Sequence, residues 1–268
     1  MLWLVSIACF GDSGEETDPW APPPLPEDLE APGADILGIE ELVGATIEPA
    51  QVGDWIGQAN DDEELRRRLA AADLVVVRSM TLRSGVWTPE AVGILAEAAS
   101  LGQLENFDAG GALLGVEGGV ALAKAPWLAN LERLVLAGAD LGDRGFSAIC
   151  DEADLRRVKD LDLRGNSLTA AGVTILGDGP FGKLERLDLS DNPLGDEGLE
   201  ALAATARVDT LRSLGIARVG FGERGVFLIA SSPYLAGLDR LDVRGNQIDP
   251  EQISGLGGTF GDDAILSD

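Results

Sequence analysis

Apolar residues recur at a fixed spacing along most of the chain. With Val77 as position 0 of a first repeat, equivalent residues follow at steps of 26 or 27. They are Val77, Leu104, Leu131, Val158, Leu184, Leu211 and Leu238. Positions 3, 5, 10 and 18 of all seven repeats are also apolar. A period of this length predicts a stack of supersecondary units that share one continuous core.

Each repeat reads as a short strand followed by a helix. Positions 3 and 5 alternate with more polar neighbours, which is typical of a strand with one buried face. Positions 15–23 read as a helix, and Thr88-Pro89 and Asp249-Pro250 supply an N-cap followed by proline. Gly177 to Pro180 should end the fourth helix early. Position 14 is glycine in the five central repeats, where we expect a close backbone approach or a turn.

The segments LERLDLSDNPLGDEGLEAL (184–202) and VKDLDLRGNSLTAAGVTIL (158–176) carry the pattern most clearly. The pattern resembles the leucine-rich repeat, in its ribonuclease-inhibitor-like class, over about residues 77–258. The resemblance implies an α/β solenoid of about seven repeats, with a curved parallel β-sheet inside and helices outside. In that family an asparagine at position 8 bonds the backbone along the stack. Here only Asn166, Asn192 and Asn246 occupy it, so we expect an interrupted ladder.

The rest of the chain divides into shorter segments. Residues 61–72 read as a helix that would lie within an N-terminal cap, 35–76, and end caps are required when repeats stack. Residues 11–34, rich in proline and acid, read as a disordered tether. Residues 249–268 would cap or fray the C-terminal end, and we assign 259–268 as a tail.

The first ten residues, MLWLVSIACF, resemble a bacterial lipoprotein signal, with cleavage and lipidation at Cys9. The resemblance implies a lipid-anchored protein of the bacterial cell envelope, and a tether after the anchor would hold the domain off the membrane. The alternative is a cytoplasmic protein with an apolar N-terminus. No other run is long enough to span a bilayer.

Charge and composition narrow the chemistry. The net charge is −26, and residues 1–65 contain 16 acids and no Lys or Arg. A chain this acidic repels phosphate backbones, so we expect no nucleic-acid partner. Histidine is absent, which removes the commonest general base and metal ligand. Only Cys9 and Cys150 are present, and Cys150 falls in a column of small residues that predicts a buried packing role. We expect no metal and no cofactor.

The register predicts which side chains line the concave face, defined here as repeat positions 2, 4 and 6. Its charged members are Arg83, Asp108, Arg133, Asp160, Asp162, Arg164, Arg186, Asp188, Arg240, Asp242 and Arg244. Equal positions of adjacent repeats should lie about 4.8 Å apart. Arg133, Asp160 and Arg186 would then alternate in charge, and Asp162 would lie beside Asp188. We expect an open lattice of ion pairs, each pair contributing little to stability.

Two chemical readings of this face compete with the lattice. Asp162 and Asp188 could share a proton in a hydrolase, which would require a strongly raised pKa for one of them. Asp188, Ser190 and Asn192 begin like a calcium loop, but Pro193 and Leu199 stand where such a loop needs glycine and glutamate.

The sequence therefore favours a non-catalytic protein-interaction module that binds a protein or peptide as a monomer and touches membranes only through a lipid at Cys9. The alternative is a regulator similar to the GTPase-activating members of the repeat family. A structural envelope lipoprotein without a discrete ligand is a further reading.

Overall fold

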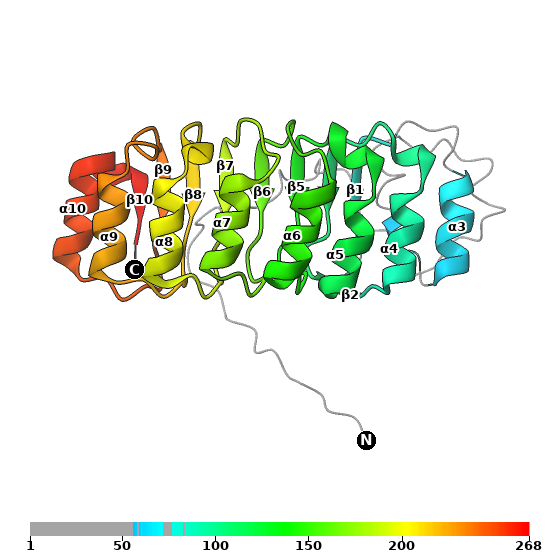
Figure 1. Ribbon diagram of the computed structural model, residues 1–268, viewed down its shortest axis with the longest axis horizontal. Helices are drawn as coiled ribbons and strands as arrows, with labels where there is room; N and C mark the ends of the chain where they lie inside the picture. The colour runs from blue at the N-terminus through cyan, green and yellow to red at the C-terminus, as the bar shows by residue number, and fades with distance from the viewer. Residues whose placement is uncertain (1–55, 58, 60, 72–76, 83, 268) are drawn as a thin grey trace, which may run out of the picture. The chain divides into compact units, whose positions relative to one another are not determined.

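The computed structural model describes residues 56–57, 59, 61–71, 77–82 and 84–267 (Figure 1). The chain divides into two compact units, 1–46 and 47–268, and all the described residues lie in the second. Cys9, the 11–34 segment, most of 35–60 and Arg83 lie outside the described residues. The predictions made for them are therefore untested by the structure.

The strands of the repeats form one parallel sheet. Within the part of the chain that the structure describes, its eight strands follow each other in chain order, and only the short pair β2 and β4 stands apart. The sheet strands are β1 (Ser79–Thr81), β3 (Asn106–Asp108), β5 (Arg133–Val135), β6 (Asp160–Asp162), β7 (Arg186–Asp188), β8 (Ser213–Gly215), β9 (Arg240–Asp242) and β10 (Ile265–Leu266). Equal repeat positions pair directly throughout, as Leu134 with Leu161 and Leu161 with Leu187. The predicted register is confirmed.

The helices form a second layer on one side of the sheet, side by side along the row of repeats (Figure 1). They are α3 (Asp62–Ala71), α4 (Pro89–Ala96), α5 (Gly115–Ala123), α6 (Gly142–Glu152), α7 (Ala170–Asp178), α8 (Gly195–Ala204), α9 (Glu223–Ser231) and α10 (Pro250–Phe260). Thr88 and Asp249 cap α4 and α10 as predicted. The α7 helix ends at Asp178, within the predicted breaker, but it is as long as α5 and so is not shortened. No described helix is long and apolar enough to cross a membrane.

The core lies between the two layers. Positions 3, 5 and 18 are buried in all seven repeats, and position 10 is buried in six. In the last repeat position 10 is Ile248, which is only partly buried. Two aromatic residues add to the core near its N-terminal end: Trp127 packs against Phe107 and donates its Nε1–H to the carbonyl of Leu95. One repeat could not bury its own apolar face, so neighbouring repeats stabilise one another.

The three asparagines of position 8 connect neighbouring repeats, and the predicted interrupted ladder is confirmed. The amide Nδ2 of Asn192 donates to the carbonyls of Leu163 and Leu189, and its Oδ1 accepts from the backbone N–H groups of Asn166 and Leu168. Where the first two repeats lack the asparagine, backbone pairs with backbone instead. This pairing forms β2 (Gly85–Val86) and β4 (Ala112–Leu113).

The glycines of position 14 make room mainly for a side chain. A Cβ atom at Gly198 would lie 2.6 Å from the Cβ of Leu194, and one at Gly225 would lie 2.7 Å from the ring of Phe221. Leu194 and Phe221 are the position 10 residues of the same repeats. The prediction of a close backbone approach is therefore incomplete, because the first helical turn closes over the position 10 side chain.

The two ends of the stack differ from each other. At the N-terminal end, α3 packs beside α4 and buries Leu65 and Leu69, close to the helix predicted at 61–72. At the C-terminal end the sheet continues, because Ile265 and Leu266 form β10 alongside β9. The expectation of a tail over 259–268 is wrong for Thr259 and Phe260, which end α10, and also for these two residues. The short turn after α10 brings them back to the sheet edge.

Candidate binding surface on the concave face

The concave face is built by the strand residues on either side of the buried position 3. In β5, β6 and β7 the central leucine points into the core, so positions 2 and 4 point to the opposite side of the sheet. Among the described residues, these positions form two rows of directly paired neighbours. We call position 2 the first row and position 4 the second row.

In the first row a single carboxylate lies between two arginines. Asp160 Oδ2 accepts from Arg133 Nη1 at 2.8 Å and from Arg186 Nη2 at 2.8 Å. The carboxylate is almost fully buried, while both guanidinium groups reach solvent. The predicted alternation of charge is confirmed at the level of individual atoms.

The first row continues to Ser213 and Arg240, without a second carboxylate. Ser213 pairs with Arg186 on one side and with Arg240 on the other. Among the described residues, the Arg240 guanidinium has no hydrogen bond or ion pair, and its Nε atom is buried without a partner. From β5 to β9, the first row thus holds three arginines and one aspartate.

In the second row two carboxylates are adjacent under one arginine. Arg164 donates through Nε and Nη2 to Asp162, at 3.1 and 2.8 Å, and its Nε lies 3.4 Å from Asp188 Oδ2. Burial, and then the nearby charge of Asp162, raise the pKa of Asp188 to about 6, although Ser190 and Arg164 oppose the rise. Asp188 therefore protonates on mild acidification.

The second row has a structural role that sequence reasoning missed. Asp108, Asp162, Asp188 and Asp242 each accept, through Oδ1, from the backbone N–H two residues ahead, at 2.8 to 3.1 Å. This side-chain turn ends the strand and satisfies a backbone donor. The signal in the sequence was aspartate at position 4 in four of the seven repeats.

The expected open lattice of exposed pairs is wrong in one respect, because the carboxylates are buried. The side chains of Asp160, Asp162 and Asp188 are 4%, 3% and 2% exposed, whereas those of their arginine partners are 24% to 51% exposed. Aspartate is short and bonds the backbone or a neighbouring guanidinium close to the sheet. Arginine is long and extends over it. The solvent therefore meets guanidinium groups.

A further ion pair flanks the rows and was not predicted. Arg218 donates through Nε and Nη2 to the two carboxylate oxygens of Asp191, at 2.5 and 2.6 Å. Both residues have a positive φ, at repeat position 7, where four of the other five repeats have glycine. Neither residue belongs to the concave-face positions 2, 4 and 6, so the register did not predict this pair. The feature of the sequence that could have indicated this ion pair is a charged residue at a repeat position that is glycine in most repeats.

The structure also bears on the competing chemical readings. Asp188 and Asp162 are adjacent and Asp188 has the raised pKa that a hydrolase would need, but both carboxyls are buried beneath Arg164 and cannot touch a substrate. Cys150 is buried as predicted, and burial raises its pKa to about 12. A thiol with that pKa is a poor nucleophile at neutral pH.

The residues of the calcium-like pattern have other partners. Ser190 Oγ accepts from the backbone N–H of Ala217, and Asn192 belongs to the asparagine ladder. Asp188 closes its strand-end turn. Ser190 and Asn192 therefore hold adjacent repeats together, and Asp188 stabilises the turn of its own repeat.

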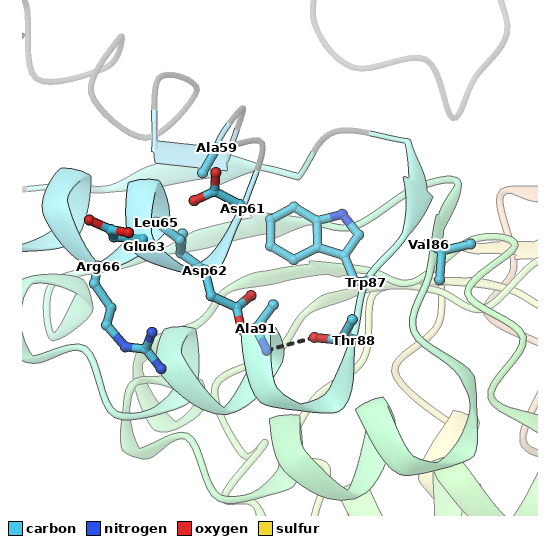
Figure 2. A pocket seen from close by; sticks show the side chains of 10 residues that line it. All are labelled: Ala59, Asp61, Asp62, Glu63, Leu65, Arg66, Val86, Trp87, Thr88 and Ala91. Atoms are coloured by element: carbon cyan, nitrogen blue, oxygen red, sulfur yellow. Dashed lines mark hydrogen bonds between the residues drawn. The ribbon is translucent and has the colours of Figure 1, made fainter.

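A separate pocket of about 540 Å³ lies at the N-terminal end of the stack, between α3 and the start of α4 (Figure 2). Figure 2 shows the Trp87 ring and the carboxylates of Asp61 and Asp62 at this pocket. Asp61 accepts from the backbone N–H of Glu64, and acids in the first turn complement the helix dipole. Capping of α3 accounts for these acids.

Comparison with known proteins agrees with the repeat architecture. Residues 128–150 and 183–203 match the family model described as Leucine Rich repeat. No curated protein matches the chain. Among solved structures, 84 chains match, including one described as the crystal structure of a TLR13–ssRNA13 complex. This chain is 18% identical to it, with a TM-score of 0.43, and the match covers 77% of this chain and 30% of that one.

The chain thus spans less than a third of the length of that relative. Together with the repeat period and the parallel sheet, the family match identifies the fold as a leucine-rich repeat solenoid. Such repeats are suited to an interaction scaffold.

Proposed function

We propose that the protein is a non-catalytic protein-interaction module that binds a protein or peptide through its concave face, and that the repeats belong to the ribonuclease-inhibitor-like class. The supporting observation is the first row, in which Asp160 holds Arg133 and Arg186 in fixed positions while leaving them at the surface. Arginine is enriched among the residues that dominate binding energy, and pre-positioned side chains lose less entropy on binding.

Steric blocking of the concave face tests this function without changing charge. Asn106 and Ser213 are partly exposed members of the first row, and Thr174 and Gln103 are exposed residues outside both rows. In a pull-down followed by mass spectrometry, Asn106→Trp with Ser213→Trp should lose the partners that the unaltered protein captures. Thr174→Trp with Gln103→Trp should retain them. Equal partner sets for both double variants would refute the choice of surface.

We further propose that the module is tethered to the bacterial cell envelope by a lipid at Cys9. The support is the apolar run before Cys9 and the acidic, proline-rich segment after it. Cys9→Ser should move the protein from the membrane fraction to the soluble fraction. Unchanged partitioning would refute the anchor and favour the cytoplasmic alternative.

The second candidate function is regulation of a partner GTPase. No contact among the described residues favours it over simple binding, so it rests on the fold alone. It would require that addition of the protein accelerate hydrolysis by a captured GTPase. Capture without acceleration leaves the binding module as the function.

A further inference from the structure

The three arginines of the first row are spaced regularly. Arg133, Arg186 and Arg240 lie on β5, β7 and β9, and each is separated from the next by one intervening strand. Because neighbouring strands are about 4.8 Å apart, the arginines follow one another at roughly 10 Å. They therefore form a line of positive groups across the middle and C-terminal part of the sheet.

These guanidinium groups retain donors for a ligand. An arginine carries five N–H donors. Arg133 and Arg186 each use one of them, on Asp160, and make no other hydrogen bond to a described residue. Arg240 has no hydrogen bond or ion pair among the described residues. The one carboxylate of this row is thus shared by two arginines, and the third has no counter-charge.

Burial makes the charge of this surface differ from that of the chain. The protein carries −26 overall, and the described concave face contains as many aspartates as arginines. However, Asp160, Asp162, Asp188 and Asp242 are buried, while arginines beside them reach solvent. A partner approaching the face meets donors and positive charge, so complementarity requires acceptors and negative charge.

We propose that Arg133, Arg186 and Arg240 bind the carboxylates of an acidic peptide segment on a partner protein. This inference rests on the proposed function, because it assumes that the concave face is the binding surface. Guanidinium groups pair with carboxylates through charge-assisted, often bidentate hydrogen bonds. The line of arginines selects a segment with acidic side chains at intervals of about 10 Å. A peptide in the polyproline II conformation places an acid at every third residue on one face at about this interval, because it has three residues per turn and rises about 3.1 Å per residue.

A peptide fits the surface better than a nucleic acid does. Proteins that bind single strands stack the bases on aromatic side chains, and no described residue of positions 2, 4 or 6 is aromatic. A long polyanion would also extend beyond the arginine row and meet the negative remainder of the chain. A short acidic segment can place all its charge within the row.

The probe for this inference is a short labelled peptide with glutamate at every third position, compared with the same peptide carrying glutamine and with an oligothymidylate of similar length. Fluorescence anisotropy on the full chain should detect binding of the glutamate peptide and not of the other two. Added salt should weaken it. Binding of the glutamine peptide with equal affinity, or concave-face binding of the oligonucleotide alone, would overturn the proposal.

Two variants locate the binding. Arg133→Gln, Arg186→Gln and Arg240→Gln combined should weaken the glutamate peptide at least about tenfold. The matched control is Arg144→Gln, Arg156→Gln and Arg224→Gln, which changes net charge equally at exposed sites outside the two rows. Arg240→Gln alone removes no internal hydrogen bond, so it should fold normally and still weaken binding several-fold.

An equal loss in the control triple would overturn the proposal, since it would show a general charge effect. Failure of the inference is distinguishable from failure of the proposed function. If the tryptophan variant at Asn106 and Ser213 abolishes partner capture while the glutamate peptide does not bind, the concave face is the binding surface but its partner is not acidic.

Discussion

Arg133 and Arg186, on strands two apart, donate to the same oxygen of Asp160, each at 2.8 Å. The shared contact fixes both guanidinium groups over the sheet and compensates one buried carboxylate. Asp160 therefore affects both the stability of the sheet and the charge of the surface.

Asp160→Asn should therefore change stability and binding in opposite directions. The substitution leaves two guanidinium groups beside a neutral amide, and we expect a loss of about 1–3 kcal/mol in the free energy of unfolding. Affinity for the glutamate peptide should rise, because the internal negative charge that competes for both arginines is gone, while the amide oxygen of the asparagine still accepts from them and keeps them in position. Chemical denaturation and anisotropy measure the two effects.

As a control, Asp154→Asn breaks the exposed pair with Arg156 and should cost less than about 1 kcal/mol. A fall in both stability and affinity at Asp160 would contradict the arrangement.

The raised pKa of Asp188 predicts a pH dependence of stability. The folded pKa is about 6 and lies above the ordinary value of 3.8, so ionisation costs more in the folded state than in the unfolded state. This penalty is absent below about pH 4, grows as the pH rises toward 6 and is complete above it. Asp188→Asn removes this penalty. The free energy of unfolding of the variant, relative to that of the unaltered protein, should therefore rise by about 3 kcal/mol between pH 4 and pH 7.

Denaturation of both proteins at several pH values checks this prediction. Arg156 lowers the pKa of Asp154 to about 2, so Asp154→Asn should show no comparable change between pH 4 and pH 7. A constant difference between Asp188→Asn and the unaltered protein over that range would contradict the raised pKa.

The asparagine ladder should be strongest where it is most buried. Asn192→Ala removes hydrogen bonds to the preceding repeat and within its own repeat. It leaves several backbone groups unsatisfied, which should cost about 3 kcal/mol. Asn246→Ala affects a partly buried position near the C-terminal end and should cost less, about 1–2 kcal/mol. Thermal or urea denaturation compares them. The reverse order would show that the ladder does not hold the centre of the stack.

Gly198 should not tolerate even one added carbon. The new Cβ of Gly198→Ala would lie 2.6 Å from the Cβ of Leu194, and relieving this overlap should cost about 1–3 kcal/mol. Gly258, in α10, is the matched control because a Cβ there meets nothing within 4 Å. Gly258→Ala should stabilise the protein by about 0.5–1 kcal/mol, because alanine is the better helix former. Equal effects of the two substitutions on the melting temperature would refute this reading of position 14.

The repeat architecture could be predicted from the sequence because strand register depends on the apolar period. Once Leu134, Leu161 and Leu187 share one column, the neighbours on either side must share the concave face. The pairing of Arg133 with Asp160 followed directly from this geometry.

Other features depended on side-chain length and backbone conformation, which the period does not encode. The burial of Asp162 and Asp188 follows from a turn that each carboxylate makes with its own backbone. Arg218 reaches Asp191 from a left-handed backbone conformation, which glycine adopts at the equivalent position of four other repeats. Likewise β10 formed in a short last segment whose spacing differs from that of the repeats.

Site-specific photo-crosslinking tests the central claim, that the concave face is the binding surface, most directly. A photoreactive phenylalanine analogue would replace Ser213, between Arg186 and Arg240 in the first row, or Thr174, on the exposed side of α7. We predict that a captured partner crosslinks from position 213 and not from position 174. Crosslinking from position 174 but not from position 213 would contradict the account.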